Sequence, residues 1–573
     1  MATLHFKGKS AVWNHHLSVP YQTLDPVTKM SHKGKGEEEN LIVEGDNLTA
    51  LKSLLPQYRG RIKCIYIDPP YNTGEEKWVY NDNINNPIIK SWIGKVVGKE
   101  GEDLTRHDKW LCMMTPRLKL LKELLSDDGV IFVSIDDVEA QYLRLLLNEI
   151  FGDENHIASF IWEGGMKNDS KYISDSHDYI FGYSKDFQLM KLKNKKWRIQ
   201  KEGLEEIYEK AEMFVEESGN DYEKASALLN TWYKDIGKKH PAYRNRHYNK
   251  IDEKGVFFPS DISWPGGGGP KFEVLHPETK KPVRVPSRGW MYSTIDALNK
   301  AAKEDEIYFG PDENKVPTYK RYLSNTEGQV LSSIFYKDRR ASTKSLRELF
   351  DGKDLFENPK DVNVLMDLID VVTDDNDIVL DSFAGSGSTA QAVLELNKED
   401  GGNRKFILVQ IPEETGKESD AHKAGYKTVQ EITQARVKKV IKRDGLDTGF
   451  TYYKLGQQID ADGILSGDLP SYDDFAKYVY YLATGKNYPA KSKVDTKKYF
   501  VGKDEATAVF LVYENDFEKL KSMALTLDLA KDLHKQHEGR KIVYAPACFL
   551  DEHHLDQFNI TFVGIPFNLF ERN

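Results

Sequence analysis

The chain has 573 residues, enough for roughly three to four domains of about 150 residues each. It is 39% hydrophobic and 30% charged. No apolar window approaches the roughly 20 residues of a membrane span, and the start lacks a secretory signal. We therefore expect a soluble cytoplasmic protein, bacterial and nucleoid-associated if it acts on DNA, with no membrane partner. The net charge of −10 argues against a nucleic-acid partner without excluding one, because binding depends on where the charge lies.

The cysteines and histidines predict neither disulfides nor a metal site. Cys64, Cys112 and Cys548 lie far apart and suit a reducing compartment. The pairs His15-His16 and His553-His554 lack a third ligand at metal spacing, so no metal is expected.

The first 184 residues alternate short apolar strands with amphipathic helices. Strands are expected at three β-branched or apolar runs: 40–44, 62–67 and 129–135. Apolar residues three and four apart predict two helices: 47–55 and 110–125. A hairpin is expected from strands at 159–162 and 179–183. This alternation predicts an α/β fold with an open, Rossmann-like parallel sheet.

A second block of the same character begins about 300 residues later, with a strand, a helix and a strand at 377–381, 389–396 and 405–410. The region between the blocks is irregular and rich in Tyr, Trp, Gly and Pro. Its glycine run at 266–269 is expected to be a flexible loop, because it lacks the ending of a phosphate-binding loop. After Asp444, three strands are expected to flank a long helix from about Phe517 to His534: 508–513, 541–544 and 560–563.

The expected domains follow from these changes of pattern. They are an N-terminal arm, a first core segment, an inserted domain, a second core segment and a small C-terminal α/β domain: 1–39, 40–184, 185–345, 346–445 and 446–573.

The motif Asp68-Pro69-Pro70-Tyr71 stands at the carboxyl end of a predicted strand, the end where open parallel sheets bind ligands. Two prolines fix the backbone and remove two N–H donors, which leaves the Pro69 carbonyl and the Asp68 carboxylate as acceptors. Two acceptors that grip an aromatic amino group localise its nitrogen lone pair for attack on a methylsulfonium. Tyr71 offers a face for stacking a flipped-out base. A plain strand-ending turn is the alternative.

A glycine-rich turn from Asp381 to Thr389 follows the second-block strand and precedes its helix. Its glycines permit a close approach to the backbone, and the helix start offers N–H groups to a carboxylate. The same pattern could hold a dinucleotide, or no ligand at all.

Together, Asp68-Pro-Pro-Tyr71 and Phe383-Ala-Gly-Ser-Gly-Ser-Thr389 resemble the signature pair of S-adenosylmethionine-dependent amino-methyltransferases that act on DNA. The catalytic motif comes first, which is similar to the order of the β-class N6-adenine enzymes. Surrounding phrases, such as Glu44 to Leu48 and Val133 to Asp137, resemble the modification (Mod) subunit of type III restriction–modification systems. The resemblance implies a class I methyltransferase sheet in permuted motif order, with S-adenosyl-L-methionine as cofactor. It covers about residues 40 to 445.

The resemblance also implies the catalytic set, which is Asp68, Pro69, Pro70 and Tyr71, and a set of cofactor residues. Among the cofactor residues, Asp46 would face the adenine or cap a helix, and Lys360 would lie near the cofactor carboxylate. Gln410 stands in the place of a ribose-binding acid, a role that Glu413 or Glu414 could share. The cofactor residues of the loop are Asp381, Phe383, Ala384, Gly385, Ser386, Gly387 and Thr389.

In the resemblance, residues 185–345 take the place of a target-recognition domain. From Lys234 to Arg288 there are 12 Lys or Arg against 6 Asp or Glu. The candidates for contacts with double-stranded DNA are Arg244, Arg246, Lys271, Arg284 and Arg288. Trp264 and Trp290 are expected to be core residues.

Several readings stay open. Cytosine-N4 methylation would suit Ser rather than Asp before Pro-Pro-Tyr, and RNA methylation would suit Asn. The chain could instead be a specificity or scaffold subunit for a partner nuclease-helicase, or an orphan or phage-defence adenine methyltransferase. The resemblance also implies a homodimer and an ATP-dependent restriction (Res) subunit as a partner, since this sequence has no Walker-type loop of its own.

Overall fold

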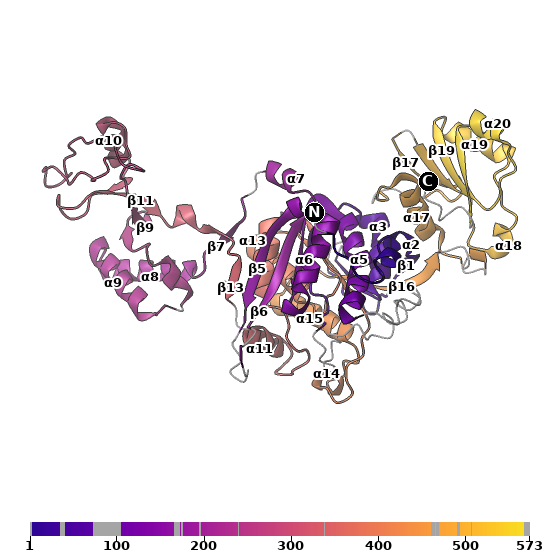
Figure 1. Cartoon of the computed structure of the whole chain (residues 1–573), viewed down its shortest axis with the longest axis horizontal. Coiled ribbons are helices and arrows are strands. Elements are labelled where there is room, and N and C mark those ends of the chain that lie inside the picture. Colours follow the sequence, from indigo (N-terminus) through magenta and orange to yellow (C-terminus); the bar gives the residue numbers. More distant parts are fainter. Residues whose placement is uncertain are drawn as a thin grey trace. The chain divides into compact units, whose positions relative to one another are not determined.

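The computed structural model describes residues 3–34, 40–72, 105–164, 172–173, 176–193, 196–238, 240–336, 339–459, 464–465, 469–489, 493–505 and 507–565. The chain divides into two compact units. The larger consists of Met1–Lys196 with Ser332–Asn573, and the smaller is Trp197–Leu331 (Figure 1). No described helix is long and apolar enough to cross a bilayer.

The larger unit is built on a ten-stranded sheet. In spatial order its strands are β1 (Tyr21–Pro26), β16 (Thr451–Ile459), β2 (Leu41–Glu44), β15 (Lys405–Gln410), β14 (Ile378–Asp381), β3 (Ile62–Ile67), β4 (Leu125–Ile135), β6 (His177–Ser184), β5 (His156–Glu163) and β13 (Ile334–Tyr336). From β16 to β4 the neighbours are parallel, and β6 is antiparallel to both β4 and β5. The five parallel strands from β2 to β4, followed by the reversed β6, form the class I methyltransferase sheet, and β16 adds a sixth parallel strand beside β2.

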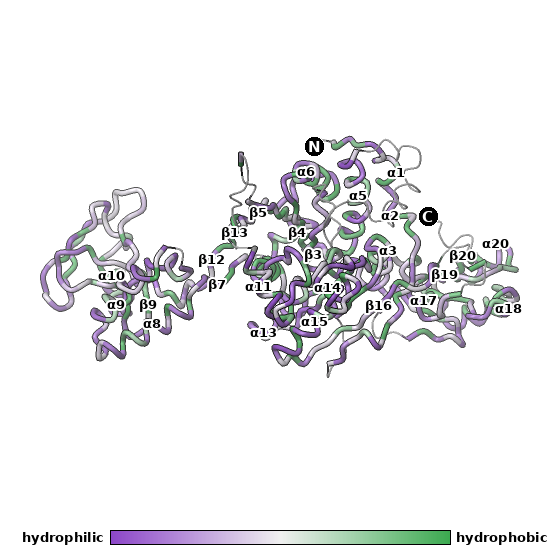
Figure 2. Tube along the Cα trace, turned by 90° about the horizontal axis from the view of Figure 1, so that it is seen from below, coloured by the Kyte–Doolittle hydropathy of each residue, from purple (hydrophilic) through white to green (hydrophobic). Residues whose placement is uncertain are grey.

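Both faces of the central strands β15, β14, β3 and β4 are largely buried, which is what an all-apolar parallel strand requires. Alternate residues of β3 divide between the faces: Ile65 and Ile67 join one core cluster, while the equally buried Cys64 and Tyr66 lie outside it. Figure 2 shows hydrophobic runs in such central strands. The first core is covered by α3 (Asn47–Tyr58), α5 (Arg106–Leu124) and α6 (Asp137–Phe151). A second packed group consists of α12 (Val362–Val372), α13 (Ser388–Asp400) and α15 (Val429–Asp444).

The sheet has a topological switch point between β14 and β3. From β14 the chain passes through α13 to β15 on one side, whereas from β3 it passes through α5 to β4 on the other. Ligands of open α/β sheets bind where the two directions diverge, outside the carboxyl ends of the strands. Asp68 follows β3 and Asp381 ends β14, so the two motifs meet at this point.

The boundaries of the structural units differ from those expected. The arm at 1–39 is no separate piece, because β1 pairs with β16 and extends the main sheet. β16 itself, expected beyond the core, pairs with β2. The smaller unit is shorter than 185–345 at both ends, since α7 (Phe187–Leu192) and β13 remain with the larger unit. The remaining helices of the larger unit are α1 (Lys9–Val12), α2 (His15–Ser18), α11 (Arg339–Leu349) and α14 (Asp420–Lys423).

The smaller unit has two helices packed on a four-stranded antiparallel sheet. They are α8 (Leu204–Glu217) and α9 (Tyr222–Asp235), with strands in the order β10 (Ile307–Tyr308), β11 (Thr318–Tyr322), β9 (Gly255–Ser260) and β8 (Lys250–Asp252), followed in sequence by α10 (Ile295–Lys303). A ribbon of β7 (Arg198–Gln200) and β12 (Gly328–Val330) joins its two ends. Trp290 is fully buried and donates to the Phe272 carbonyl, so it is a core residue as expected, while Trp264 is half-buried.

Residues after 469 form a second sheet within the larger unit, in the order β17 (Phe500–Asp504), β18 (Thr507–Leu511), β19 (Arg540–Ala545) and β20 (Ile560–Gly564), with α17 (Tyr472–Thr484) and α20 (Glu552–Gln557). The single long helix expected here is wrong. The chain forms α18 (Phe517–Leu520) and α19 (Leu527–Gln536) instead. Between them Leu525 bridges to Cys548, and Thr526 then caps the new helix.

Candidate active site

The Asp-Pro-Pro-Tyr motif leaves the carboxyl end of β3 with its backbone held from α5. The indole Nε1 of the fully buried Trp110 donates to the Pro70 carbonyl at 2.7 Å. This bond occupies the carbonyl of the second proline, so of the two proline carbonyls the one at Pro69 is the candidate acceptor. Asn72 then adopts a left-handed conformation with φ of 61°. The next two residues, Thr73 and Gly74, lie outside the described residues.

A buried carboxylate fixes that left-handed residue. The Asn72 amide donates to Glu139 Oε1 at 2.5 Å, and His107 Nδ1 contacts the same oxygen at 2.7 Å. Glu139 is fully buried on α6, and burial raises the pKa of its carboxyl despite these two partners. Sequence reasoning missed Glu139 and His107. The only signal was their nearness to the phrase Val133 to Asp137 and to the start of a helix.

Lys360 lies at the catalytic motif. Its ammonium forms an ion pair with Asp68 Oδ1 at 3.1 Å, donates to the Tyr71 hydroxyl, and stands 4.7 Å from the centre of the Tyr71 ring. A second carboxylate, Asp178 on β6, lies 3.7 Å away, and Trp162 covers the same ammonium at 5.5 Å. The expectation that Lys360 meets the cofactor carboxylate remains a prediction, because the partners observed here belong to the catalytic motif.

The Asp68 side chain is partly buried and partly exposed. Its Oδ1 is fully buried and pairs with Lys360, and 27% of the side chain is exposed. Burial raises the pKa of Asp68, and the ammonium of Lys360 opposes that rise. Burial and the charges of Asp178 and Asp68 likewise raise the pKa of Tyr71, so its hydroxyl stays neutral. Asp68 is therefore a partly exposed carboxylate that has a lysine and a neutral tyrosine hydroxyl as neighbours.

The glycine-rich loop is organised by Asp381, which caps the turn internally. Its two oxygens accept from the Phe383 N–H at 2.9 Å and the Thr389 hydroxyl at 2.6 Å. Burial raises the pKa of Asp381 to about 7, with the Asp68 charge adding to the rise. Asp381 and Thr389 thus shape the loop. Four further residues of the loop are buried: Phe383, Ala384, Ser386 and Gly387.

Gly385 is tied on both sides by side chains. Its N–H donates to Gln410 Oε1 at 2.8 Å, and its carbonyl accepts from the Thr433 hydroxyl at 2.5 Å. Gln410 is only 2% exposed, and its amide nitrogen donates to the Ile411 carbonyl. Both polar ends of Gln410 are therefore engaged within the protein. In this structure it supports the cofactor loop rather than standing free for a ribose.

A buried arginine lies under the same loop and was not foreseen. Arg436 on α15 donates to the hydroxyls of Ser386 at 2.7 Å and Ser388 at 2.8 Å, and to the Gln391 amide at 2.8 Å. Its side chain is 1% exposed, and burial lowers its pKa to about 9. No signal in the sequence distinguishes this arginine, because it lies about 50 residues beyond the loop on an ordinary amphipathic helix.

Asp46 caps α3, as one of its two expected roles requires, by accepting from the Thr49 N–H. It also pairs with the buried Arg117 at 2.8 Å. Arg117 holds Asn47, which donates in turn to the Ser382 carbonyl at 2.9 Å. The acidic residue after β2 is thereby linked to the glycine-rich loop two strands away.

The five candidate DNA contacts all lie in the smaller unit, and all five are exposed: Arg244, Arg246, Lys271, Arg284 and Arg288. Arg288 pairs with Asp261 at 2.5 Å, Arg244 lies 3.6 Å from Glu202, and Arg246 stacks on Tyr243. Exposure suits contacts with phosphates, and their role remains a prediction.

One histidine pair has a third potential ligand after all. Asp551 lies close enough to His553 and His554 for one atom of each to fall within 4.8 Å. All three are exposed or half-buried, and Asp551 already caps α20. The group is a surface cluster remote in sequence from both motifs.

The geometry defines a class of protein: a methyltransferase with its donor loop and its acceptor motif side by side at the switch point of a class I sheet. The comparisons name the family. Residues 62–420 match the model of the N6/N4 DNA methylases, described as "DNA methylase", and the chain belongs to this family.

The relatives are restriction–modification methyltransferases. The chain is 33% identical to the EcoP15I Mod subunit of Escherichia coli, over 76% of this chain and 69% of the relative. It is 31% identical to the EcoPI Mod subunit of Escherichia phage P1, over 74% and 66%. The type II methyltransferase M.KpnI of Klebsiella pneumoniae is 29% identical, over 69% and 86%. This chain thus spans about two thirds of the type III relatives' length. The solved structure of the M1.HpyAVI–SAM complex matches with 12% identity and a TM-score of 0.27, over 69% of this chain and 98% of that one.

Methylases of this family take their methyl group from S-adenosyl-L-methionine, and the donor loop fits that group. The N-terminus of α13 has no side-chain cap, which leaves its N–H groups for a carboxylate. Ser382 Oγ is buried, and among the described residues it has no hydrogen-bond partner. One segment contacts both the donor loop and the acceptor motif. A ring carbon of Phe356 lies 3.4 Å from the position that a Cβ on Gly385 would take, and Lys360 forms an ion pair with Asp68.

Proposed function

We propose that this DNA methyltransferase moves the methyl group of S-adenosyl-L-methionine onto N6 of an adenine flipped out of double-stranded DNA. The observation that carries the proposal is Asp68, a partly exposed carboxylate that pairs with Lys360 at the switch point of the sheet. A lone strand-ending turn would not need a buried, ion-paired carboxylate beside a preorganised glycine-rich loop.

A carboxylate oxygen of Asp68 accepts one N–H of the amino group, and the Pro69 carbonyl accepts the other. This grip draws the nitrogen toward tetrahedral geometry and stabilises the positive charge that develops on it. When bound, the cofactor supplies an electrophilic methyl group. The chain's own residues position the base, and Tyr71 stacks on it. Release of a proton from the methylated nitrogen restores the neutral amine, and Asp68 is the nearest acceptor.

Lys360 supports this proposal in a second way. Its ammonium is a nitrogen with N–H donors that contacts the Asp68 carboxylate and stands over the Tyr71 ring. In the proposed mechanism Asp68 accepts an N–H of the adenine, and Tyr71 stacks on its ring. We therefore assign Lys360 to holding Asp68 ionised while the base enters.

Asp rather than Ser at the head of the motif favours adenine over cytosine. Single-molecule sequencing of DNA from cells that express the chain tests this directly and also reads out the recognition sequence. The proposal expects N6-methyladenine at one recurring sequence. N4-methylcytosine in its place would contradict it.

The partners follow from the relatives. The EcoP15I and EcoPI proteins are Mod subunits of type III restriction–modification enzymes, and we propose the same role here. The chain would give sequence specificity to an ATP-dependent restriction subunit, act as a homodimer, and read DNA through the unit at 197–331. An orphan methyltransferase is the alternative. Co-purification of a restriction subunit with the tagged chain from its native host supports the type III role. Its absence at full methylation activity supports the orphan reading.

A further inference from the structure

A pocket in the larger unit lies away from the methyltransferase site. It has a volume of about 600 Å³, in the range of small-molecule sites, and is lined from α2, α5, α6, the α3–β3 turn and the residue after β6. Arg59 and Gly60 line it just before β3 begins, whereas Asp68 follows the end of that strand. A strand of six residues separates the two places by about 20 Å.

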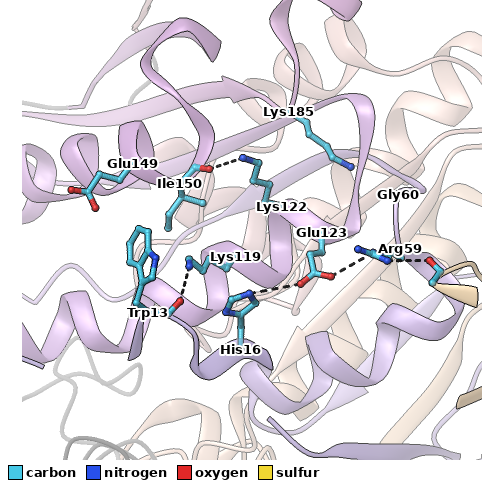
Figure 3. Close-up of a pocket in the computed structure, with 11 residues that line it drawn as sticks. Trp13, His16, Arg59, Gly60, Lys119, Lys122, Glu123, Glu149, Ile150 and Lys185 are labelled. Carbon is cyan, nitrogen blue, oxygen red and sulfur yellow. Dashed lines mark hydrogen bonds and ion pairs between the residues drawn. The ribbon is translucent and has the colours of Figure 1, made fainter. Parts of the chain in front are cut away.

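The pocket wall is positive. Four lining side chains are Lys or Arg and two are Glu, as Figure 3 shows. Both carboxylates are already neutralised: Glu149 by Lys9 at 2.6 Å, and Glu123 by Arg59 at 3.4 Å with His16 at 3.9 Å. The lysines therefore determine the field inside the pocket.

Two of these lysines have only neutral acceptors among the described residues. Lys119 donates to the Trp13 carbonyl at 2.6 Å and lies 3.8 Å from the centre of its ring. Lys122 donates to the Ile150 carbonyl at 2.6 Å. In the described part of the chain neither has a carboxylate within ion-pair distance. Each ammonium has three N–H donors, so donors remain for a ligand.

The lysines also repel one another. Burial and the neighbouring charge of Lys122 lower the pKa of Lys119, and burial with the charge of Lys185 lowers the pKa of Lys122. Lys185 adds a third ammonium, held by the Leu125 carbonyl at 2.7 Å and by the exposed Asp127 at 3.1 Å. A multivalent anion between these groups would relieve the repulsion and receive several charge-assisted hydrogen bonds.

We propose that this pocket binds a phosphate-bearing small molecule, with Lys119, Lys122 and Lys185 as its phosphate ligands. A polyphosphate suits three ammoniums that line one pocket better than a single carboxylate does, because its charge is spread over several oxygens. The remaining volume accommodates the rest of a molecule the size of a nucleotide. The proposal is independent of methyl transfer and stands whichever base is methylated.

Isothermal titration of the full chain with inorganic pyrophosphate at low ionic strength tests the site. Wild-type protein should bind saturably, and Lys119→Gln and Lys122→Gln should each weaken binding by about tenfold or more. Lys531→Gln, at an exposed position on α19, is the matched control and should bind as wild type does. Lys122→Arg should bind measurably, which separates lost charge from lost folding.

Two outcomes would overturn the proposal: no saturable binding of pyrophosphate, or equal affinity in the wild type and both glutamine variants. A further arm identifies the source of the phosphate. Pyrophosphate that still binds with double-stranded DNA present at saturation indicates a free small-molecule ligand. Pyrophosphate displaced by DNA in the wild type, through the same two lysines, assigns the pocket to the nucleic-acid backbone.

Discussion

Asp68 depends on its neighbours for both its charge and its position. Lys360 opposes the effect of burial on the carboxyl, while Trp110 and the Asn72–Glu139 bond fix the backbone that follows it. The motif residues themselves could be read from the sequence. Their supports could not, because Trp110, Glu139 and Lys360 come from three segments that only the fold brings together.

Replacement of Lys360 tests whether it keeps Asp68 ionised. Lys360→Met removes an opposite charge 3.1 Å from the carboxylate, so the pKa of Asp68 should rise further. The ionised form then appears only at higher pH, and the acid limb of the methylation rate against pH should move upward by about one to three units. Single-turnover rates measured across pH report the midpoint.

Lys344→Met, at an exposed position on α11, is the control and should leave the midpoint in place. A Lys360→Met variant with an unmoved midpoint and only a raised KM for the cofactor would show that this lysine serves the cofactor carboxylate instead.

Glu139 is a positioning residue, and its loss should slow the chemical step. Glu139→Ala leaves the Asn72 amide without its acceptor and releases the left-handed turn, so kcat should fall by about 100-fold with cofactor affinity unchanged. Asn72→Ala should have the same effect, and the double variant should be no slower than either one. Additive losses in the double variant would contradict the proposed link between Glu139 and Asn72. Glu154→Ala, at an exposed position just before β5, serves as the control.

At the scale of elements, the glycine-rich loop is held by side chains from three directions. Asp381 closes it from within, Gln410 and Thr433 bind Gly385, and Arg436 holds its serines. The strand, the loop and the helix were all predictable from apolar runs and glycine spacing. The position of Gln410 at a strand end predicts a contact with the cofactor, which stays a prediction; the structure adds that its amide lies against the loop.

Two glycines at opposite ends of α13 separate backbone strain from loop geometry. Gly387 and Gly401 both have positive φ, 84° and 75°, so alanine at either should lower stability by about 1 kcal/mol or more. At Gly387 the new Cβ would also lie 3.2 Å from Thr433 Cγ2, whereas at Gly401 it meets open space. Only Gly387→Ala should weaken cofactor binding, as measured by titration. Equal cofactor affinities in the two variants would contradict the loop assignment.

At the scale of the whole molecule, the chain is an enzyme core interrupted by an insertion. The alternation of strands and helices predicted the core, and each strand expected there lies within a few residues of its place, whereas β1, β16 and β13 were not expected. The insert and the late helices were harder to predict. There, short strands and capping residues such as Thr526 decide the structure, and these carry little periodic signal.

Excision of the smaller unit tests whether this unit binds DNA while the larger unit binds the cofactor. Arg198 and Val330 are paired across the β7–β12 ribbon, so a short Gly-Ser linker can close the gap left by removing 197–331. The shortened protein should bind S-adenosyl-L-methionine as the full chain does and lose DNA affinity by about tenfold or more. Undiminished DNA affinity would place sequence recognition elsewhere.

The central claim is that Asp68 and the glycine-rich loop form one site for methylating adenine. Its most direct test is mass spectrometry of nucleosides from DNA incubated with the purified chain and methyl-labelled S-adenosyl-L-methionine. Wild-type protein should produce labelled N6-methyladenine, and Asp68→Ala should produce none while binding both DNA and cofactor. Label on cytosine, or label retained on adenine in the variant, would contradict the account.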